Sequence, residues 1–259
     1  MTTPARLPLD GVSVLITRPQ GQAEQVAKAI AAAGGDPILF PTIEIQPIEN
    51  PAALNALLDR LDDFQIAIFV SANAVDSSLP LLLQRRRDFS KLRFSAVGAA
   101  TKSALEGFGI TGVIAPTRRH DSEALLALPE LQAVAGKRLV IFRGESGREV
   151  IAETLRGRGA EVEYAACYRR IRPHRDASAL AARWQAGDVH AVSAMSVESI
   201  SNLMDMVDEP TRKLLAVTPV FVPHPRIAQD AQKLGLTNVL VTGQSNGALI
   251  ESLSTCRKP

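Results

Sequence analysis

The two halves of the chain repeat one pattern, in which a short apolar run is followed by a polar loop, a helical pattern and a closing glycine. The first copy begins at Gly11 and the second at Gly136. Two further matches lie 124 to 126 residues apart, pairing 67–75 with 191–199 and 94–109 with 219–235. A nearly constant offset distinguishes an internal repeat from chance similarity. The chain is therefore interpreted as a duplicated unit.

Short apolar strands alternate with amphipathic helices in both halves. This order is typical of parallel sheets with helices on both faces, as in doubly wound α/β folds. Each half is also predicted to end on a strand, a polar turn and a helix, with the strands at 113–114 and 239–241. The pattern predicts two α/β domains. A single large α/β domain is the alternative, because the strand–helix pattern is common.

Two segments, 36–47 and 160–173, stand apart from this alternation. Both are rich in β-branched or aromatic residues, and each ends at a proline. Such segments are predicted to be extended. They match each other in the duplication and are the expected crossing points between domains.

Composition excludes several classes of protein. The formal net charge is +2, from 29 basic and 27 acidic residues, without the basic excess of a nucleic-acid-binding domain. No run approaches the roughly 18 apolar residues that span a membrane, and no secretory signal is recognised. Cys167 and Cys256 are too few for a disulfide framework and are expected to be buried or incidental thiols. A soluble cytoplasmic protein is expected.

Small polar residues and glycines follow the predicted strands. Ligands of doubly wound sheets bind at the carboxyl ends of strands, where helix starts present N–H groups to anions. The alternative for Ser71, Thr101 and Ser196 is that they only cap the helices they precede. The repetition after several strands favours an anion site, with these candidates: Ser71, Asn73, Gly98, Thr101, Gly144 and Ser196.

Three arginines, Arg18, Arg143 and Arg226, lie in or beside loops of the same kind. A guanidinium can hold a carboxylate through two parallel hydrogen bonds. These arginines are therefore candidate ligand contacts. The alternative is a solvated surface arginine.

Several catalytic motifs are missing from the sequence. It contains no GxSxG, no Walker lysine loop, no GxGxxG and no HExxH, and its four histidines lack paired spacing. For His224, which follows a predicted strand, a neutral histidine at a helix start is the favoured interpretation. We expect neither a metal nor an organic cofactor.

Five motifs in order carry a resemblance to a known family: Thr17-Arg18-Pro19, FVSANAV at 69–75, VGAAT at 97–101, RGESGRE at 143–149 and VEYAACYRR at 162–170. Together they resemble the uroporphyrinogen-III synthase family, over about residues 11–253. The second half departs from the family pattern. Ala194-Met195-Ser196 stands in place of a loop of small hydroxyl residues, and Arg226 is the counterpart of Thr101 in the repeat.

The resemblance implies two flavodoxin-like, parallel-sheet domains joined by a two-stranded β-ladder. The first domain would be discontinuous, at 1–39 and 174–259, and the second would span 48–159. The ladder would use 40–47 and 160–173.

The resemblance also implies a cofactor-free lyase that acts on hydroxymethylbilane, a linear tetrapyrrole with an acetate and a propionate on every pyrrole. The enzyme would close the ring with the terminal pyrrole inverted and water lost, as a monomer in tetrapyrrole (haem) biosynthesis, and would bind the substrate between its domains. Transient handover from hydroxymethylbilane synthase would fit this role.

Tyr168, at the position of the family's ladder tyrosine, is the candidate proton or hydrogen-bond donor to the leaving hydroxide. Its alternative is a strand tyrosine that only packs. For the whole chain, the alternative function is a two-lobed cytoplasmic anion-binding or sensor module without catalysis.

Overall fold

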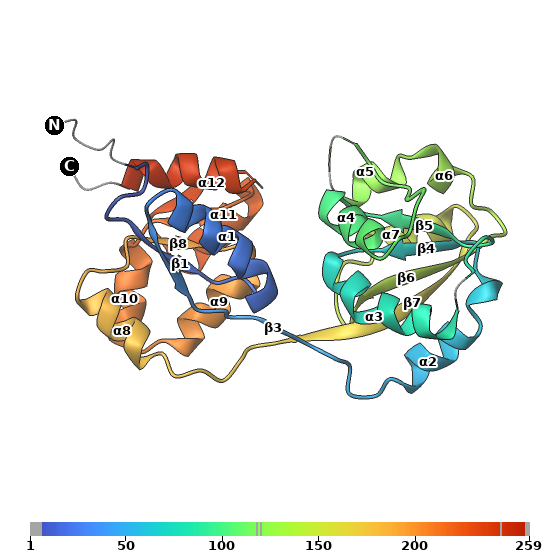
Figure 1. The fold of residues 1–259 in the computed structure, drawn as a ribbon, viewed down its shortest axis with the longest axis horizontal. Coiled ribbons are helices and arrows are strands. Elements are labelled where there is room, and N and C mark those ends of the chain that lie inside the picture. The colour runs from blue at the N-terminus through green and yellow to red at the C-terminus, as the bar shows by residue number, and fades with distance from the viewer. Residues whose placement is uncertain (1–6, 87, 118, 120, 244, 257–259) are drawn as a thin grey trace. The chain divides into compact units, whose positions relative to one another are not determined.

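The computed structural model describes residues 7–86, 88–117, 119, 121–243 and 245–256. The chain divides into two compact units (Figure 1). The first unit comprises Met1–Glu44 with Ile171–Pro259, and the second comprises Ile45–Arg170. The described strands form two separate five-stranded sheets. The predicted α/β class is confirmed.

The sheet of the first unit has the strand order β10-β9-β8-β1-β2. All its strand pairs are parallel. Residues on β1 alternate between two hydrophobic clusters, with Leu15 in one and Val14 and Ile16 in the other. The strands are β1 (Ser13–Ile16), β2 (Asp36–Leu39), β8 (Ala191–Ser193), β9 (Val220–Val222) and β10 (Val239–Val241).

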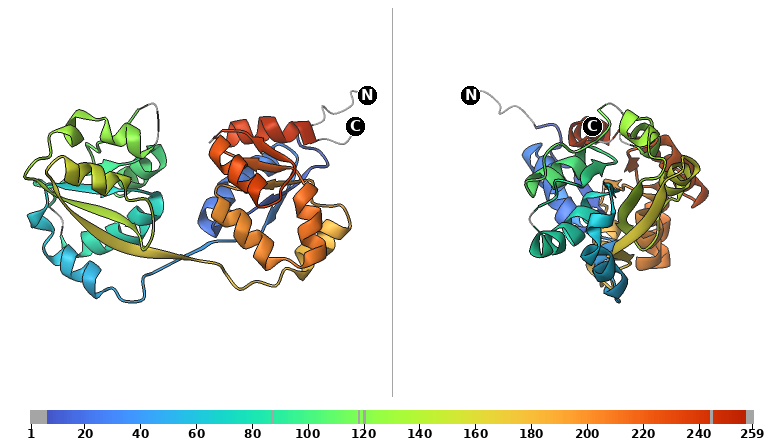
Figure 2. Two further views of the ribbon diagram at one scale, coloured as in Figure 1. Left: turned by 180° about the vertical axis from the view of Figure 1, so that it is seen from behind. Right: turned by 90° about the vertical axis from the view of Figure 1, so that its right-hand side faces the viewer.

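Helices cover both faces of this sheet (Figure 2). Buried residues of α1 (Gln20–Ala32) and α12 (Asn246–Leu253) join the cluster of Val14. The other cluster takes its helical residues from α8 (Ser178–Gln185), α9 (Val197–Met206), α10 (Glu209–Val217) and α11 (Pro225–Lys233).

The sheet of the second unit has the strand order β3-β7-β6-β4-β5. Strand β4 is parallel to β5 and β6, and β6 is parallel to β7. The 36–47 segment is therefore divided, since β2 belongs to the first sheet and β3 lies beside β7 in the second. The strands are β3 (Glu44–Gln46), β4 (Ile66–Phe69), β5 (Arg93–Ala96), β6 (Arg138–Gly144) and β7 (Glu161–Ile171).

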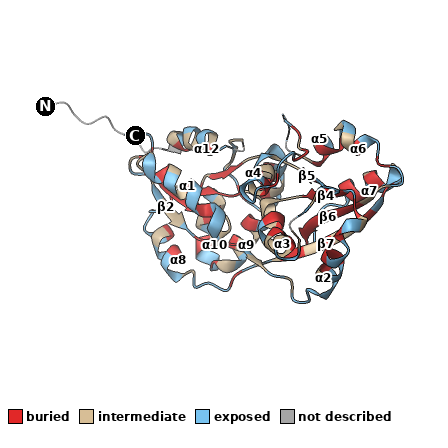
Figure 3. Ribbon diagram, turned by 45° about the vertical axis from the view of Figure 1, so that its right-hand side comes forward, coloured by how far each residue is buried: buried red, intermediate tan, exposed pale blue. Residues whose placement is uncertain are grey.

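The central strands of the second sheet are buried on both faces, and Figure 3 shows β4 and β6 in red. On one face the rings of Phe69 and Phe142 stack with their centroids 4.5 Å apart. That face packs against α2 (Ala52–Asp59), α3 (Ala72–Arg85) and α4 (Ala99–Gly107). The other face packs against α5 (Ser122–Leu126), α6 (Pro129–Gln132) and α7 (Val150–Gly157).

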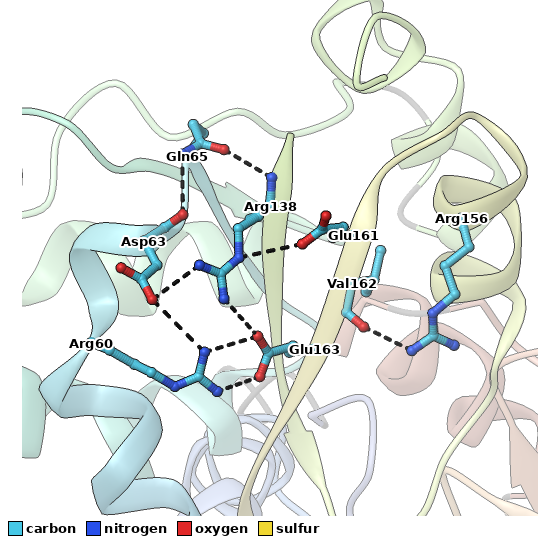
Figure 4. Close-up of polar contacts among 8 residues, drawn as sticks. All are labelled: Arg60, Asp63, Gln65, Arg138, Arg156, Glu161, Val162 and Glu163. Atoms are coloured by element: carbon cyan, nitrogen blue, oxygen red, sulfur yellow. Dashed lines mark hydrogen bonds and ion pairs between the residues drawn. The ribbon is translucent and has the colours of Figure 1, made fainter. Parts of the chain in front are cut away.

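An ion-pair network joins the amino-terminal part of the second sheet to the turn before β4 (Figure 4). Arg138 contacts Glu161 and Glu163 of β7 and also Asp63. Arg60 donates to both carboxylate oxygens of Glu163. These side chains are partly exposed and screened by solvent, so each pair contributes little to stability. The network aligns the starts of β6 and β7.

One predicted strand is absent from the described residues. The segment 113–114 makes only an isolated parallel bridge, from Ile114 to Ser95. Gly112 turns the chain with a φ of 66° just before it, and Pro116 follows it. The extended stretch between them is too short for a ladder. In addition, no described helix has the length and apolar character needed to cross a membrane.

Candidate functional site

A cavity of about 300 Å³ lies at the carboxyl ends of the strands in the second unit. Parallel register brings these ends to one edge, since Phe69 lies opposite both Ala96 and Phe142. The loops after β4, β5 and β6 and the end of β7 contribute to the lining, including Val70, Ser71, Val97, Arg143, Tyr164 and Tyr168.

The hydroxyl of Tyr168 lies 3.2 Å from the Ser71 Oγ, and either group can be the donor. Tyr168 is only 2% exposed. Ser71 also caps α3, because its Oγ accepts a hydrogen bond from the Ala74 N–H at 3.1 Å. The capping interpretation of Ser71 is confirmed, and the same atom contacts the candidate catalytic phenol.

Gly144 makes room for the ring of Tyr168. A Cβ at residue 144 would lie 3.0 Å from Cε2 and 3.1 Å from Cζ of this ring. The approach depends on a register shift, since Arg143 pairs with Ala166 but Gly144 pairs with Tyr168. The shift leaves Cys167 as an extra residue on β7. Cys167 is buried, and desolvation raises the pKa of its thiol to about 12.

Arg143 is a buried cation in the wall of the cavity, with its side chain only 8% exposed. Its Nη1 donates to the Glu149 Oε1 at 2.7 Å. Its Cζ lies 4.6 Å from the ring centroid of Tyr164, within cation–π range. Tyr164 donates its hydroxyl hydrogen to the other oxygen of Glu149.

These contacts shift two pKa values in opposite directions. Hydrogen bonds from Tyr164 and then from Arg143 lower the pKa of the Glu149 carboxyl. Burial, followed by the hydrogen bond to Glu149, raises the pKa of Tyr164. Both shifts favour an ionised Glu149 carboxylate and a neutral Tyr164 phenol at neutral pH.

The other candidates of the second unit do not line this cavity. Asn73 lies in the first turn of α3, and Gly98 is the N-cap residue of α4. Thr101 is buried inside α4, so the interpretation of Thr101 as a cap is wrong. The helix begins at Ala99, two residues before Thr101, which places this threonine past the cap position.

The first unit holds three candidates, each just after a strand. Arg18 follows β1 and is half-buried, and burial lowers the pKa of its guanidinium. Its buried Nε has no hydrogen-bond partner among the described residues. Ser196 caps α9 by accepting from the Ser199 N–H at 3.1 Å. Arg226 is exposed, and its N–H donates to Nδ1 of His224, which caps α11 as expected.

Comparison with known proteins identifies the family. The family model described as uroporphyrinogen-III synthase HemD matches residues 24–251. The chain is 34% identical over 245 residues to the uroporphyrinogen-III synthase of Escherichia coli (strain K12), covering 93% of this chain and 100% of that one. The chain belongs to the uroporphyrinogen-III synthase family. The enzyme of Salmonella typhimurium matches at the same identity and coverage.

Solved structures of this family share the fold. The chain aligns with a mutant uroporphyrinogen III synthase from the extremely thermophilic bacterium Thermus thermophilus with a TM-score of 0.62 and 15% identity, covering 95% of this chain and 98% of that one. The enzyme from Helicobacter pylori 26695 aligns with a TM-score of 0.60 and 14% identity, covering 95% and 100%. The prediction of an enzyme of this family is confirmed, and these comparisons give the non-catalytic alternative no support.

Sequence reasoning missed several residues around the cavity of this family member. Tyr164 and Arg170 lie four residues before and two residues after Tyr168. Strand alternation could have indicated Arg170, because side chains two residues apart point to one face. It could not have indicated Tyr164, because the extra residue Cys167 breaks the alternation, and Tyr164 packs with the cluster on the opposite face from Tyr168. Glu149 was quoted in a motif, but nothing in its spacing indicates a contact with Arg143. The remaining missed residues of the lining are Val70, Val97, Ser122, Ile141, Ser146, Gly147, Arg148 and Ile151.

A second hollow, of about 320 Å³, lies in the same unit near the starts of β4 and β5. Its lining includes Asp62, Phe64 and Arg86, with Arg86 already paired to Asp62. Strand-end loops do not reach it, so it is a weaker candidate. The described residues also contain no group of three or more His, Cys, Asp or Glu side chains placed to hold a metal.

Proposed function

We propose that this chain cyclises hydroxymethylbilane to uroporphyrinogen III, inverts the terminal pyrrole and releases water. The observation that carries the proposal is membership of the uroporphyrinogen-III synthase family. It rests on a match along 93% of the chain to the uroporphyrinogen-III synthase of Escherichia coli. The arginine-lined cavity with a buried phenol suits a substrate that carries a carboxylate on every side chain of its pyrroles.

The proposal extends to two flavodoxin-like domains built from the duplicated unit. Numbered along the chain, the strands of the first sheet have the order 2-1-3-4-5, which is the flavodoxin-like order. The proposed domains span 1–39 with 174–259, and 48–159. Segments 40–47 and 160–173 would form the connecting ladder, and the neighbouring positions of β3 and β7 support it.

Arg143 and Arg18 are the proposed carboxylate contacts for which the structure offers most support. Each guanidinium is withdrawn from solvent, and a charge in such a position is costly unless it is paired. The unpartnered Nε–H of Arg18 would donate a hydrogen bond to an anionic ligand. Arg226 and the backbone N–H groups near Ser196 and Gly98 would add weaker contacts at helix starts.

Tyr168 is the proposed donor to the departing hydroxide. When the hydroxyl leaves as water, a pyrrole N–H loses its proton and an azafulvene forms. The phenol would hydrogen-bond or protonate the leaving oxygen, and the pyrrole proton would restore the phenol. If Ser71 donates to Tyr168, the phenol hydrogen is free to point into the cavity and developing phenolate charge is stabilised.

Ring inversion would follow from how the substrate is held. The azafulvene carbon is attacked by the substituted carbon of the last pyrrole, and the resulting spirocycle opens and recloses with that ring reversed. The unsubstituted carbon reacts without help, so the binding groups must hold the substituted carbon nearer and exclude water.

The same proposal describes a monomeric, cytoplasmic enzyme that receives hydroxymethylbilane by transient handover from hydroxymethylbilane synthase. Light scattering that gave a mass well above 27.7 kDa would contradict the monomeric part of the proposal.

The catalytic proposal is tested by incubating purified protein with hydroxymethylbilane and separating the type I and type III rings. We expect type III to predominate, whereas the spontaneous reaction yields type I. Formation of type I alone, at the spontaneous rate, would refute the proposal.

A further inference from the structure

Arg143 and Tyr164 converge on a single carboxylate in this structure. The guanidinium Nη1 donates to one oxygen of Glu149 at 2.7 Å, and the Tyr164 hydroxyl donates to the other. Two donors on two different strands, β6 and β7, are thus spaced to hold one planar carboxylate. This geometry is independent of which molecule supplies the carboxylate.

Both donors line the cavity, but the acceptor does not. The Arg143 side chain is 8% exposed, whereas that of Glu149 is 50% exposed. Glu149 lies between β6 and α7, outside both elements, and its carboxylate caps no N–H group of α7. Arg143 is therefore the fixed part of the pair, and Glu149 covers it from the solvent side.

Neighbouring groups hold the two donors in place. Arg156 lies over the ring of Tyr164 at 5.4 Å and donates to the Val162 carbonyl at 2.8 Å (Figure 4). A Cβ at Gly147 would lie 2.9 Å from the Arg143 Nη2, so the glycine leaves room for the guanidinium. Tyr164 is therefore packed without the Glu149 carboxylate, and Arg143 lies over its ring at 4.6 Å.

We propose that Arg143 and Tyr164 form a carboxylate subsite, which Glu149 occupies until a carboxylate of the substrate displaces it. The inference rests on the proposed function, because the ligand is the carboxylated tetrapyrrole of that reaction. Glu149 is then an internal competitor that keeps the buried arginine paired in the free enzyme. Removing its charge leaves both donors available to the substrate.

The test compares steady-state KM values for hydroxymethylbilane at low salt in Glu149→Gln and in wild type. The Glu149 carboxylate competes about as strongly as a partly exposed ion pair, so KM should fall about two- to fivefold. Glu149→Asp keeps the charge on a shorter side chain, so its KM should lie between those of wild type and Glu149→Gln. This variant can be used for the test if Glu149→Gln does not fold. Glu153→Gln, an equal charge change at an exposed position of α7 without contact to Arg143, is the matched control and should leave KM at the wild-type value.

A double-mutant cycle shows whether Glu149 acts through the subsite. In an Arg143→Ala background, Glu149→Gln should no longer lower KM. In the Glu149→Gln background, Tyr164→Phe should raise KM, because there the Tyr164 hydroxyl donates its hydrogen bond to a substrate carboxylate. An unchanged or raised KM in Glu149→Gln alone, or the same fall with Arg143 absent, would overturn the inference. These outcomes require wild-type protein that forms type III rings, whereas failure of wild type to form them refutes the proposed function instead.

Discussion

Replacing Tyr168 with Phe removes one oxygen from a buried ring. The ring packs against Gly144, and Phe preserves that contact. The lost hydrogen bond to Ser71 is neutral, and Ser71 retains the Ala74 N–H as a partner. No buried group is orphaned, so unfolding free energy should fall by only about 0.5–1.5 kcal/mol.

The expected effect of Tyr168→Phe on turnover is much larger. Positioned proton donors contribute on the order of 100-fold or more, and the phenol would act mainly as the hydroxyl departs. An interaction made in the transition state lowers kcat with little change in KM. The product should still be type III, because the groups that fold the substrate remain.

The assay measures kcat, KM and the isomer ratio in wild type and in the Phe variant, with urea unfolding for stability. Ser71→Ala is the companion variant, since it keeps the phenol but removes its partner and the α3 cap, at a cost of about 1 kcal/mol in stability. Wild-type turnover in Tyr168→Phe would leave the tyrosine as a packing residue. Release of mainly type I would mean that Tyr168 steers ring inversion instead.

Three further predictions concern binding, the buried thiol and metal content. Replacing Arg143 or Arg226 with Ala should weaken substrate binding by roughly 1–3 kcal/mol per lost contact, and added salt should weaken substrate binding by wild type. Unchanged affinity in both variants would mean that the two arginines have only structural or surface roles. The Cys167 thiol has its pKa raised from 9.0 to about 12, so its thiolate population at pH 8 should be about a thousandfold below that of the unfolded chain. Maleimide should therefore label Cys167 slowly until urea unfolds the protein. The contribution of the protonated Cys167 thiol to stability should be lost as pH rises from 9 toward 12. Elemental analysis of active protein should find no stoichiometric zinc or iron, and finding either would contradict the cofactor-free expectation.

Much of the fold could be predicted from the sequence, because helix and strand periods are local properties. The apolar runs at 12–16 and 139–142 predicted β1 and β6 to within two residues. The strand predicted at 113–114 failed, because two apolar residues between Gly112 and Pro116 do not specify pairing. Apolar patterning also could not reveal that 36–47 divides between two sheets, since partner choice is set by tertiary contacts.

The candidate site was predictable in position but not in detail. Strand-end reasoning found Ser71 and Arg143, the family resemblance indicated Tyr168, and the structure brings all three to one cavity. The hydrogen bond between Ser71 and Tyr168 joins residues 97 positions apart and depends on a register shift that no sequence motif encodes. The contact of Arg143 with Glu149 could not be predicted for a different reason. An acidic residue near a helix start is usually interpreted as a favourable partner of the helix dipole, so nothing indicated a contact with an arginine.

The central claim is catalysis of ring closure with inversion, and the most direct measurement varies the enzyme concentration at fixed hydroxymethylbilane. The initial rate of type III formation should rise in proportion to enzyme, while the type I fraction falls because the spontaneous reaction loses its substrate. Tyr168→Phe should show the same dependence with a slope lower by about 100-fold. A type III rate that does not depend on enzyme concentration, with type I forming at its spontaneous rate throughout, would contradict the account.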